Sequence, residues 1–324
     1  MAKEIYKNIY LHEIPLPKNP LKAINCYIIT SEDRNLIIDT GFNIEPCKES
    51  MMKALDELNL KVDQTDVLIT HLHSDHCGLA SFLSEAGMDI YAGKVDGIFM
   101  NEMTTEAYWD TFKKYAQMYD LDRDHVDGND HPGYKFCPKE LMDFKLLEEG
   151  NIINLGDYRF EVVDVPGHTP GHIALYERKH KLMFCGDHIL DQITPNIAFW
   201  GYGQDMLQVY FDSLNKVSGY EIEYLFPAHR NIIKDYKKRI QELLKHHDNR
   251  LEEILNIISD KEISVRDVAA QMKWELKYSN WTEFPNAQKW FASSEAMAHL
   301  EHLACTDKVD KQIKDGIFYF KARA

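Results

Sequence analysis

The chain has 324 residues with 52 acidic and 37 basic side chains, a formal net charge of −15 at pH 7. Such acidity argues against a protein that coats nucleic acid or sits on an anionic membrane surface. The six cysteines are widely spaced, the N-terminus has no continuous apolar stretch, and no run of 18 apolar residues occurs. We therefore expect a cytoplasmic protein with reduced thiols, no secretion signal and no membrane span.

The first 70 residues read as strands with one intervening helix. Apolar runs at 24–29 and 36–39 predict two strands joined by a turn at 31–35. Apolar side chains at helical spacing predict a helix over 47–58. A short apolar run at 67–70 predicts a further strand.

The most informative stretch, His71-Leu72-His73-Ser74-Asp75-His76, directly follows that strand. Imidazoles and carboxylates are typical ligands of zinc and similar metals, and the C-terminal end of a strand is where α/β folds place chemistry. In a turn, His71 and His73 can converge on one ion while Asp75 and His76 reach a second. A solvated polar loop is the alternative interpretation.

Residues 95–144 are interpreted as an insertion. Aromatic side chains recur at helical spacing over 108–119 and predict an amphipathic helix, whereas the polar stretch 120–133 predicts a loop. The helix is expected to pack on the main domain. Its location also suits a lid over the site, because long insertions near catalytic edges often shape pockets.

Four further apolar runs each end in a metal-competent side chain. In chain order these side chains are Asp39, His168, Asp187 and His229. With the cluster at 71–76, five predicted strands could deliver His or Asp to the same edge of a sheet. This repetition indicates a metal site more strongly than any single motif.

The character of the chain changes near residue 235. Residues 235–324 hold 15 Lys or Arg and 15 Asp or Glu, so the whole acidic excess lies in 1–234. A long amphipathic helix is predicted at 236–258, another helix at 293–304 and a hairpin at 309–320. These features predict a catalytic domain over 1–234 and a smaller domain over 235–324.

The five motifs, in this order and spacing, resemble those of the metallo-β-lactamase-fold hydrolase superfamily over residues 5–235. The resemblance implies an α/β fold (α+β in some schemes), a four-layer αββα sandwich with a dinuclear metal site at one edge. It implies that a first metal is bound by His71, His73 and His168, and a second by Asp75, His76 and His229, with Asp187 bridging the two. Asp39 would lie near the site and hydrogen-bond a histidine ligand, without being a principal ligand itself.

The bridging Asp and the full histidine set resemble glyoxalase II and its thioesterase relatives most, although the RNA-processing branch shares much of this set. Residues 235–324 resemble a small, mostly helical, winged-helix-like domain found in one hydrolase branch. Two divalent ions, Zn²⁺ by default with Fe or Mn as alternatives, would share a hydroxide that attacks an acyl carbonyl or a phosphorus centre. Asp75, the expected catalytic residue, would orient this hydroxide and receive its proton.

Residues beside these motifs could either contact substrate or serve a structural role. His188 would either contact substrate or hydrogen-bond a ligand, and Trp200 and Tyr202 are candidate walls of the substrate pocket. His172 is interpreted as a hydrogen-bonded structural residue. The histidines of the C-terminal helices are interpreted as surface residues on solvated faces: His246, His247, His299 and His302.

Three functions compete. The leading hypothesis is a dinuclear metal-dependent hydrolase acting on a small ester, thioester or lactone. The runner-up is a phosphodiesterase or ribonuclease, but a nucleic-acid channel needs clustered Lys and Arg, and only the short basic run at 234–239 offers them. A non-catalytic metal-bound sensor is the third. We therefore expect a small-molecule substrate rather than nucleic acid or membrane, and the sequence leaves a homo-oligomer open.

Overall fold

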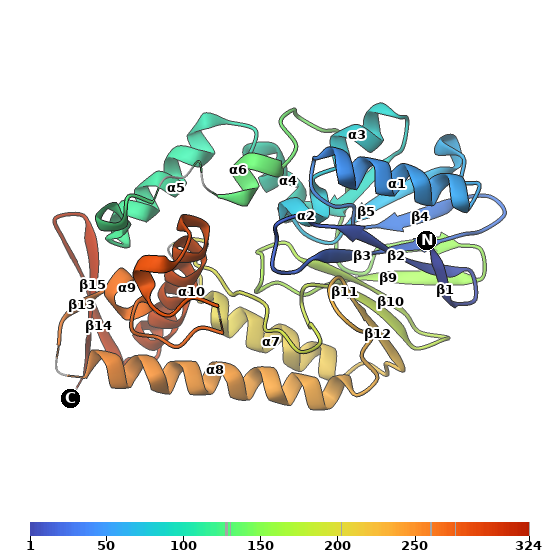
Figure 1. Cartoon of the computed structure of the whole chain (residues 1–324). Coiled ribbons are helices and arrows are strands. Elements are labelled where there is room, and N and C mark those ends of the chain that lie inside the picture. Colours follow the sequence, from blue (N-terminus) through green and yellow to red (C-terminus); the bar gives the residue numbers. More distant parts are fainter. Residues whose placement is uncertain (127–128, 130, 202, 260, 276, 324) are drawn as a thin grey trace.

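The structure is a computed structural model that describes residues 1–126, 129, 131–201, 203–259, 261–275 and 277–323. Two β-sheets pack face to face, helices cover their outer faces, and a third, smaller sheet lies at the C-terminal end (Figure 1). The fold class expected from the sequence, a four-layer αββα sandwich followed by a C-terminal region, is confirmed.

The first sheet has seven strands in chain order: β1 (Lys3–Tyr6), β2 (Ile9–Pro15), β3 (Ala23–Ile29), β4 (Asn35–Ile38), β5 (Thr65–Ile69), β6 (Ile90–Gly93) and β7 (Lys145–Leu147). β5 has a parallel neighbour on each side and is buried along its whole length. A strand that is buried on both faces usually has a continuous run of apolar residues, as residues 67–69 do here. The outer face packs against α1 (Glu45–Glu57), α3 (Ala80–Glu85) and α4 (Lys94–Glu102).

The second sheet has five strands in the order β12-β11-β10-β9-β8, with bounds β8 (Ile152–Leu155), β9 (Tyr158–Asp164), β10 (Ile173–Glu177), β11 (Leu182–Gly186) and β12 (Tyr224–Pro227). Its outer face packs against α7 (Met206–Ser218) and the first half of α8 (Tyr236–Ile258). Between the two sheets lies an aromatic core in which the ring of Tyr27 is 5.1 Å from Phe184 and 5.5 Å from Phe226.

The polar motifs come from both sheets. β4 and β5 belong to the first sheet, whereas β9, β11 and β12 belong to the second. The expectation that one sheet edge collects all five motifs is therefore wrong. Two facing sheets contribute, because residues 3–147 complete a seven-stranded sheet and residues 152–227 then form a separate five-stranded sheet that packs against it.

The insertion contains the predicted helix as α5 (Glu106–Met118), followed by η2 (Leu121–Asp124) and α6 (Pro132–Phe136). The polar stretch predicted as loop thus includes a 3₁₀ turn. Trp109 packs on the first sheet's helices, but Tyr119 and Leu121 share a core with the C-terminal region. The insertion therefore connects the two parts of the molecule and does not pack on the main domain alone.

After α8, the C-terminal region contains, in chain order, β13 (Ile263–Ser264), α9 (Val265–Ala269), η4 (Trp281–Glu283), the long helix α10 (Asn286–Cys305), β14 (Val309–Lys314) and β15 (Ile317–Ala322). The long helix α8 runs along the lower side of the view in Figure 1, from the C-terminal region to the second sheet, and contributes to both cores. The boundary at 234/235 and the winged-helix assignment stay predictions. In the described part of the chain, no helix combines the length and the apolarity needed to cross a membrane.

Candidate metal centre

The loop after β5 brings His71 into the interior, where the residue is fully buried. The hydroxyl of Thr70 donates to the Asp39 carboxylate at 2.8 Å, so it accepts from Nδ1 of His71 at 3.1 Å. This arrangement places the proton of His71 on Nδ1. Nε2 of His71 then points to Nδ1 of His73, 3.1 Å away.

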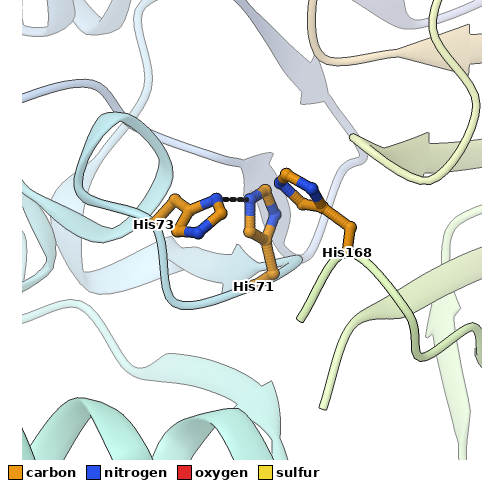
Figure 2. A group of neighbouring side chains, drawn as sticks. All are labelled: His71, His73 and His168. Carbon is orange, nitrogen blue, oxygen red and sulfur yellow. Dashed lines mark hydrogen bonds between the residues drawn. The ribbon is translucent and has the colours of Figure 1, made fainter. Parts of the chain in front are cut away.

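His168, from the loop between β9 and β10, approaches these two rings from the other sheet, and the three side chains converge in Figure 2. Each offers a ligand atom, and these atoms lie within 4.8 Å of one another. Nδ1 of His168 donates to the backbone carbonyl of Asn196 at 2.7 Å. Nε2 therefore carries the free lone pair, and within the described residues it has no hydrogen-bond partner.

A second group consists of Asp75, His76 and His229, whose ligand atoms also lie within 4.8 Å of one another. Nδ1 of His229 donates to the carbonyl of Ala23 at 2.9 Å, and Nδ1 of His76 donates to Asp39 at 2.9 Å. Both rings consequently turn Nε2 toward Asp75, at 3.4 Å for His229 and 3.9 Å for His76.

Asp187, after β11, lies between the two groups. Its Oδ2 is 3.6 Å from Nε2 of His76 and 3.7 Å from Nε2 of His168, and its Oδ1 is 3.7 Å from Nε2 of His229. The structure thus brings all seven predicted ligand residues into one centre, with Asp187 in contact distance of residues from both sets.

The charge state of the centre suits a cation. Burial lowers the pKa of His71 and of His168, which favours the neutral imidazole in both. Burial opposes ionisation of Asp75, yet the adjacent His76 and His229 hold its pKa at about 2. For Asp187 burial likewise opposes ionisation, but His229 and His76 bring its pKa well below the ordinary range.

The unpaired atoms test whether these residues fit a metal. Within the described residues, four buried atoms of the centre have no hydrogen-bond partner: Nε2 of His76, His168 and His229, and Oδ1 of Asp187. Buried polar atoms without partners are costly and rare unless an ion or water satisfies them. Nitrogen and oxygen donors that converge in this way fit divalent transition-metal ions.

Asp39 lies behind the centre, where the sequence placed it. It is buried, adopts a left-handed backbone with φ of 61° and accepts hydrogen bonds from the N–H and the hydroxyl of Thr70 as well as from His76. Asp tolerates this backbone region better than most residues.

Asp96, at the start of α4, was missed by sequence reasoning. It is fully buried and accepts from Leu72 N–H at 2.9 Å, from the Thr169 hydroxyl at 2.6 Å and from Gly171 N–H at 2.6 Å. Burial raises its pKa to about 6, although these three hydrogen bonds act in the opposite direction. Asp96 ties the loop of His71 and His73 to the loop of His168. An acidic residue in a helical first turn was its only signal.

The remaining predicted site residues lie around the centre. His172 stacks on His71 with ring centres 4.6 Å apart, and its Nε2 accepts from Asp187 N–H at 3.1 Å, a hydrogen-bonded role as expected. His188 is fully buried with its ring against Tyr210, 5.4 Å away. Trp200 packs against Phe99 of the insertion, with ring centres 6.1 Å apart. Tyr202 lies outside the described residues.

The prediction that the histidines of the C-terminal helices are exposed surface residues is wrong for three of them. Nδ1 of His247 lies 3.0 Å from Nε2 of His299, and both residues are fully buried. His302 is buried beside Asp205, 2.9 Å away. The reason is that α10 packs against α7, α8 and α9, which leaves it little exposed surface.

Comparison with known proteins agrees with this architecture. The profile of the family described as "Metallo-beta-lactamase superfamily" matches residues 20–229. The chain is 24% identical to "Probable metallo-hydrolase YqjP" of Bacillus subtilis, over 89% of this chain and 90% of the relative. It is 32% identical to "Hydroxyacylglutathione hydrolase GloC" of Haemophilus influenzae, over 50% of this chain and 65% of the relative.

A solved structure shares the fold over nearly the whole length. The metallo-beta-lactamase family protein TTHA1429 from Thermus thermophilus superposes with a TM-score of 0.81 at 23% identity, covering 99% of this chain and 100% of that one. The fold that surrounds the centre, the C-terminal region included, is therefore not peculiar to this chain. Since the family profile spans well over half of the sequence and all of its polar motifs, the chain belongs to the metallo-beta-lactamase superfamily.

Proposed function

We propose that this protein is a dinuclear metal-dependent hydrolase that cleaves a small thioester, with simple esters and lactones as related substrates. One observation carries the proposal: two groups of three ligand residues share a centre, and Asp187 lies between them with contacts to both. A carboxylate in this position could bind both ions of a two-metal site.

The ligand assignment follows from the free donor atoms. His71, His73 and His168 would hold one ion, Asp75, His76 and His229 the other, and Asp187 both. Zn²⁺ is the default for this mixture of imidazole and carboxylate, and Fe or Mn also accept it. When bound, the ions would supply Lewis acidity and lower the pKa of a water molecule toward neutrality.

The chain's own residues position the reactants. Asp39 and the carbonyls of Ala23 and Asn196 fix the rings of His76, His229 and His168, so no reorientation is needed during reaction. Asp75 is the carboxylate we assign to orient the attacking water and receive its proton. Its side chain is 13% exposed, against 9% for Asp187, which leaves Asp75 the more accessible.

The thioester assignment draws on the relatives. GloC is named a hydroxyacylglutathione hydrolase, and the relative MBLAC2 of Gallus gallus, 26% identical over 52% of this chain and 58% of its own length, an acyl-coenzyme A thioesterase. Both names denote a small-molecule thioester as substrate. A cytoplasmic location is part of the proposal, and it fits six free cysteines of which five are buried.

Metal analysis and a substrate panel test this function. We expect about two metal ions per chain after supply with Zn²⁺, and turnover of thioesters above that of lactones, β-lactams, phosphodiesters and RNA. Asp187→Ala should abolish turnover in a folded protein. Asp191→Ala is the matched control, because Asp191 lies on the same loop but bonds to Asn231. Less than one ion per chain would refute the dinuclear centre. Preferred cleavage of phosphodiesters would refute the thioester assignment and indicate a phosphodiesterase.

A further inference from the structure

The centre is connected to the C-terminal helix α10, far outside residues 20–229 that match the family. The first link is the backbone carbonyl of Asn196, which accepts from Nδ1 of His168 at 2.7 Å. Asn196 lies in the segment between β11 and α7, which contains no helix or strand among its described residues. Something outside the segment must therefore hold this carbonyl in place.

The second link is the side chain of Asn196. Its Nδ2 donates to Oε2 of Glu295 at 2.7 Å and, more weakly, to the carbonyl of Phe291 at 3.3 Å, both on α10. The side chain of Glu295 is only 9% exposed. A hydrogen bond to a carboxylate is about twice as strong as one between neutral groups, so Glu295 is the dominant anchor of Asn196.

Glu295 is in turn supported by Arg250 on α8. Nε of Arg250 lies 3.7 Å from Oε1 of Glu295, and the guanidinium stacks over Trp274 at 4.4 Å from the ring centre. Burial raises the pKa of Glu295, while Arg250 and the amide of Asn196 lower it. Burying a carboxylate is costly, and an apolar contact would join helix and segment at lower cost. The buried carboxyl group at this position, with its hydrogen bond to Asn196, thus points to a task beyond packing.

We propose that Glu295 is a positioning residue of the metal centre, which fixes Asn196 and through its carbonyl the Nδ1–H tautomer and ring direction of His168. The C-terminal region is thereby part of the working centre and not a separate attachment. The inference rests on the proposed function for the role of His168 as a ligand. Without Glu295 the carbonyl of Asn196 drifts, and Nε2 of His168 is no longer held toward His71 and His73.

Ser294, the preceding residue on α10, provides a matched control. Its hydroxyl accepts from Phe199 N–H at 3.3 Å, so it joins the same helix to the same segment through Phe199, whereas the Asn196 side chain bonds to Glu295 and Phe291. Ser294 is buried like Glu295. A purely structural role for Glu295 predicts similar consequences for both substitutions, whereas a positioning role separates them.

The experiment measures the loss of Zn²⁺ from the full-length protein to an excess of chelator, with thermal unfolding recorded in parallel. For Glu295→Ala we expect about tenfold faster release from part of the bound metal, the lower end of the range for residues that support metal ligands. Asn196→Ala, at a partly exposed position, should give the same acceleration. Ser294→Ala should release metal at the wild-type rate even if its Tm falls.

Release at the wild-type rate by both Glu295→Ala and Asn196→Ala overturns the proposal, as does equal acceleration by Ser294→Ala. If Glu295→Ala does not fold, Asn196→Ala decides. Imidazole ¹⁵N NMR of the metal-free protein adds a second readout: His168 should be protonated on Nδ1 in the wild type and mixed in Asn196→Ala. Failure of the proposed function would give a different result from failure of the positioning role. A protein that holds metal but turns over no thioester refutes the activity and leaves the positioning role of Glu295 standing.

Discussion

Asp39 accepts a hydrogen bond from Nδ1 of His76 at 2.9 Å while the hydroxyl of Thr70 donates to the same carboxylate and accepts from Nδ1 of His71. One buried carboxylate thus sets the tautomers of two histidines, His76 directly and His71 through Thr70. Both rings turn Nε2 into the centre as a result. The two halves of the proposed dinuclear site share a single orienting group.

This relationship makes Asp39 sensitive to loss of charge. In Asp39→Asn the left-handed backbone is kept, because Asn tolerates φ near 61°. The amide cannot accept from Thr70 and His76 as the carboxylate does, so His76 loses its fixed tautomer. We expect metal affinity to fall by about 10- to 100-fold, measured by competition with a chromogenic chelator.

Asp66→Asn is the control for this substitution. Asp66 is a buried carboxylate on the neighbouring strand β5, but it lies at the opposite end of that strand from Thr70 and pairs with Arg34. We expect Asp66→Asn to lower the free energy of unfolding and leave metal affinity unchanged. Wild-type affinity in Asp39→Asn would show that Asp39 does not orient His76.

Patterns that are local in the sequence predicted much of this fold. The helix at 236–258 is found with the same bounds, and strands at 24–29 and 67–70 are found within two residues, because apolar periodicity alone defines such elements. The clustering of His and Asp after strands placed Asp39, Asp187 and His229 together for the same reason, since each motif is complete within a few residues.

Features that depend on long-range packing were not predictable. Asp96 serves the centre only because the chain brings Gly171 within hydrogen-bond distance, 75 residues away. His299 is buried because α10 is enclosed by other helices, which its own helical pattern does not reveal. The division of the motifs between two sheets likewise depends on strand pairing, for which an apolar run carries little information.

Gly171 is a position where the absence of a side chain should prove essential. A Cβ added there would lie 2.3 Å from the backbone nitrogen of Asp96 and 2.7 Å from its carboxylate, and both groups are buried. Gly171→Ala must displace Asp96 or the loop that carries His168. We expect a loss of stability of about 1–3 kcal/mol together with weaker metal binding, measured by urea unfolding and chelator competition.

The matched substitution is Gly219→Ala. A Cβ at Gly219 would meet only the carbonyl oxygen of Lys216 at 3.4 Å, an ordinary contact. This variant should unfold within about 0.5 kcal/mol of the wild type and keep its metal. Equal behaviour of the two variants would contradict the proposed tie between Asp96 and the His168 loop.

Removal of the metal should destabilise the whole chain. Without a cation, the buried carboxylates of Asp75 and Asp187 depend on the nearby imidazoles of His76, His168 and His229. Each ion that binds only the folded state adds about 2.7 kcal/mol at a free concentration near 100 Kd. We therefore expect chelation to lower Tm and added Zn²⁺ to restore it. Asp187→Ala should lose most of this response. A wild-type Tm that does not change on addition of chelator would argue against a structural contribution of the metal.

Acid should release the insertion from the C-terminal region through Asp124 of η2. This carboxylate accepts from Arg266 Nε at 2.7 Å, Trp281 Nε1 at 2.9 Å and Lys289 Nζ at 3.1 Å. Burial opposes its ionisation, but these three donors hold its pKa at about 2, below the ordinary 3.8. A carboxyl group with a lowered pKa stabilises the fold above its unfolded pKa, and this contribution disappears as the pH falls from about 4 to 2.

Asp124→Asn should accordingly lower the free energy of unfolding by about 3 kcal/mol at pH 7, because the substitution leaves Lys289 buried without its carboxylate. The difference from the wild type should shrink steadily between pH 4 and pH 2, followed by urea unfolding at each pH. Asp157→Asn, which breaks the exposed pair with Lys7, should leave the free energy of unfolding nearly unchanged, because water screens such a pair. A constant difference down to the lowest pH would mean that Asp124 acts through its shape and not through its charge.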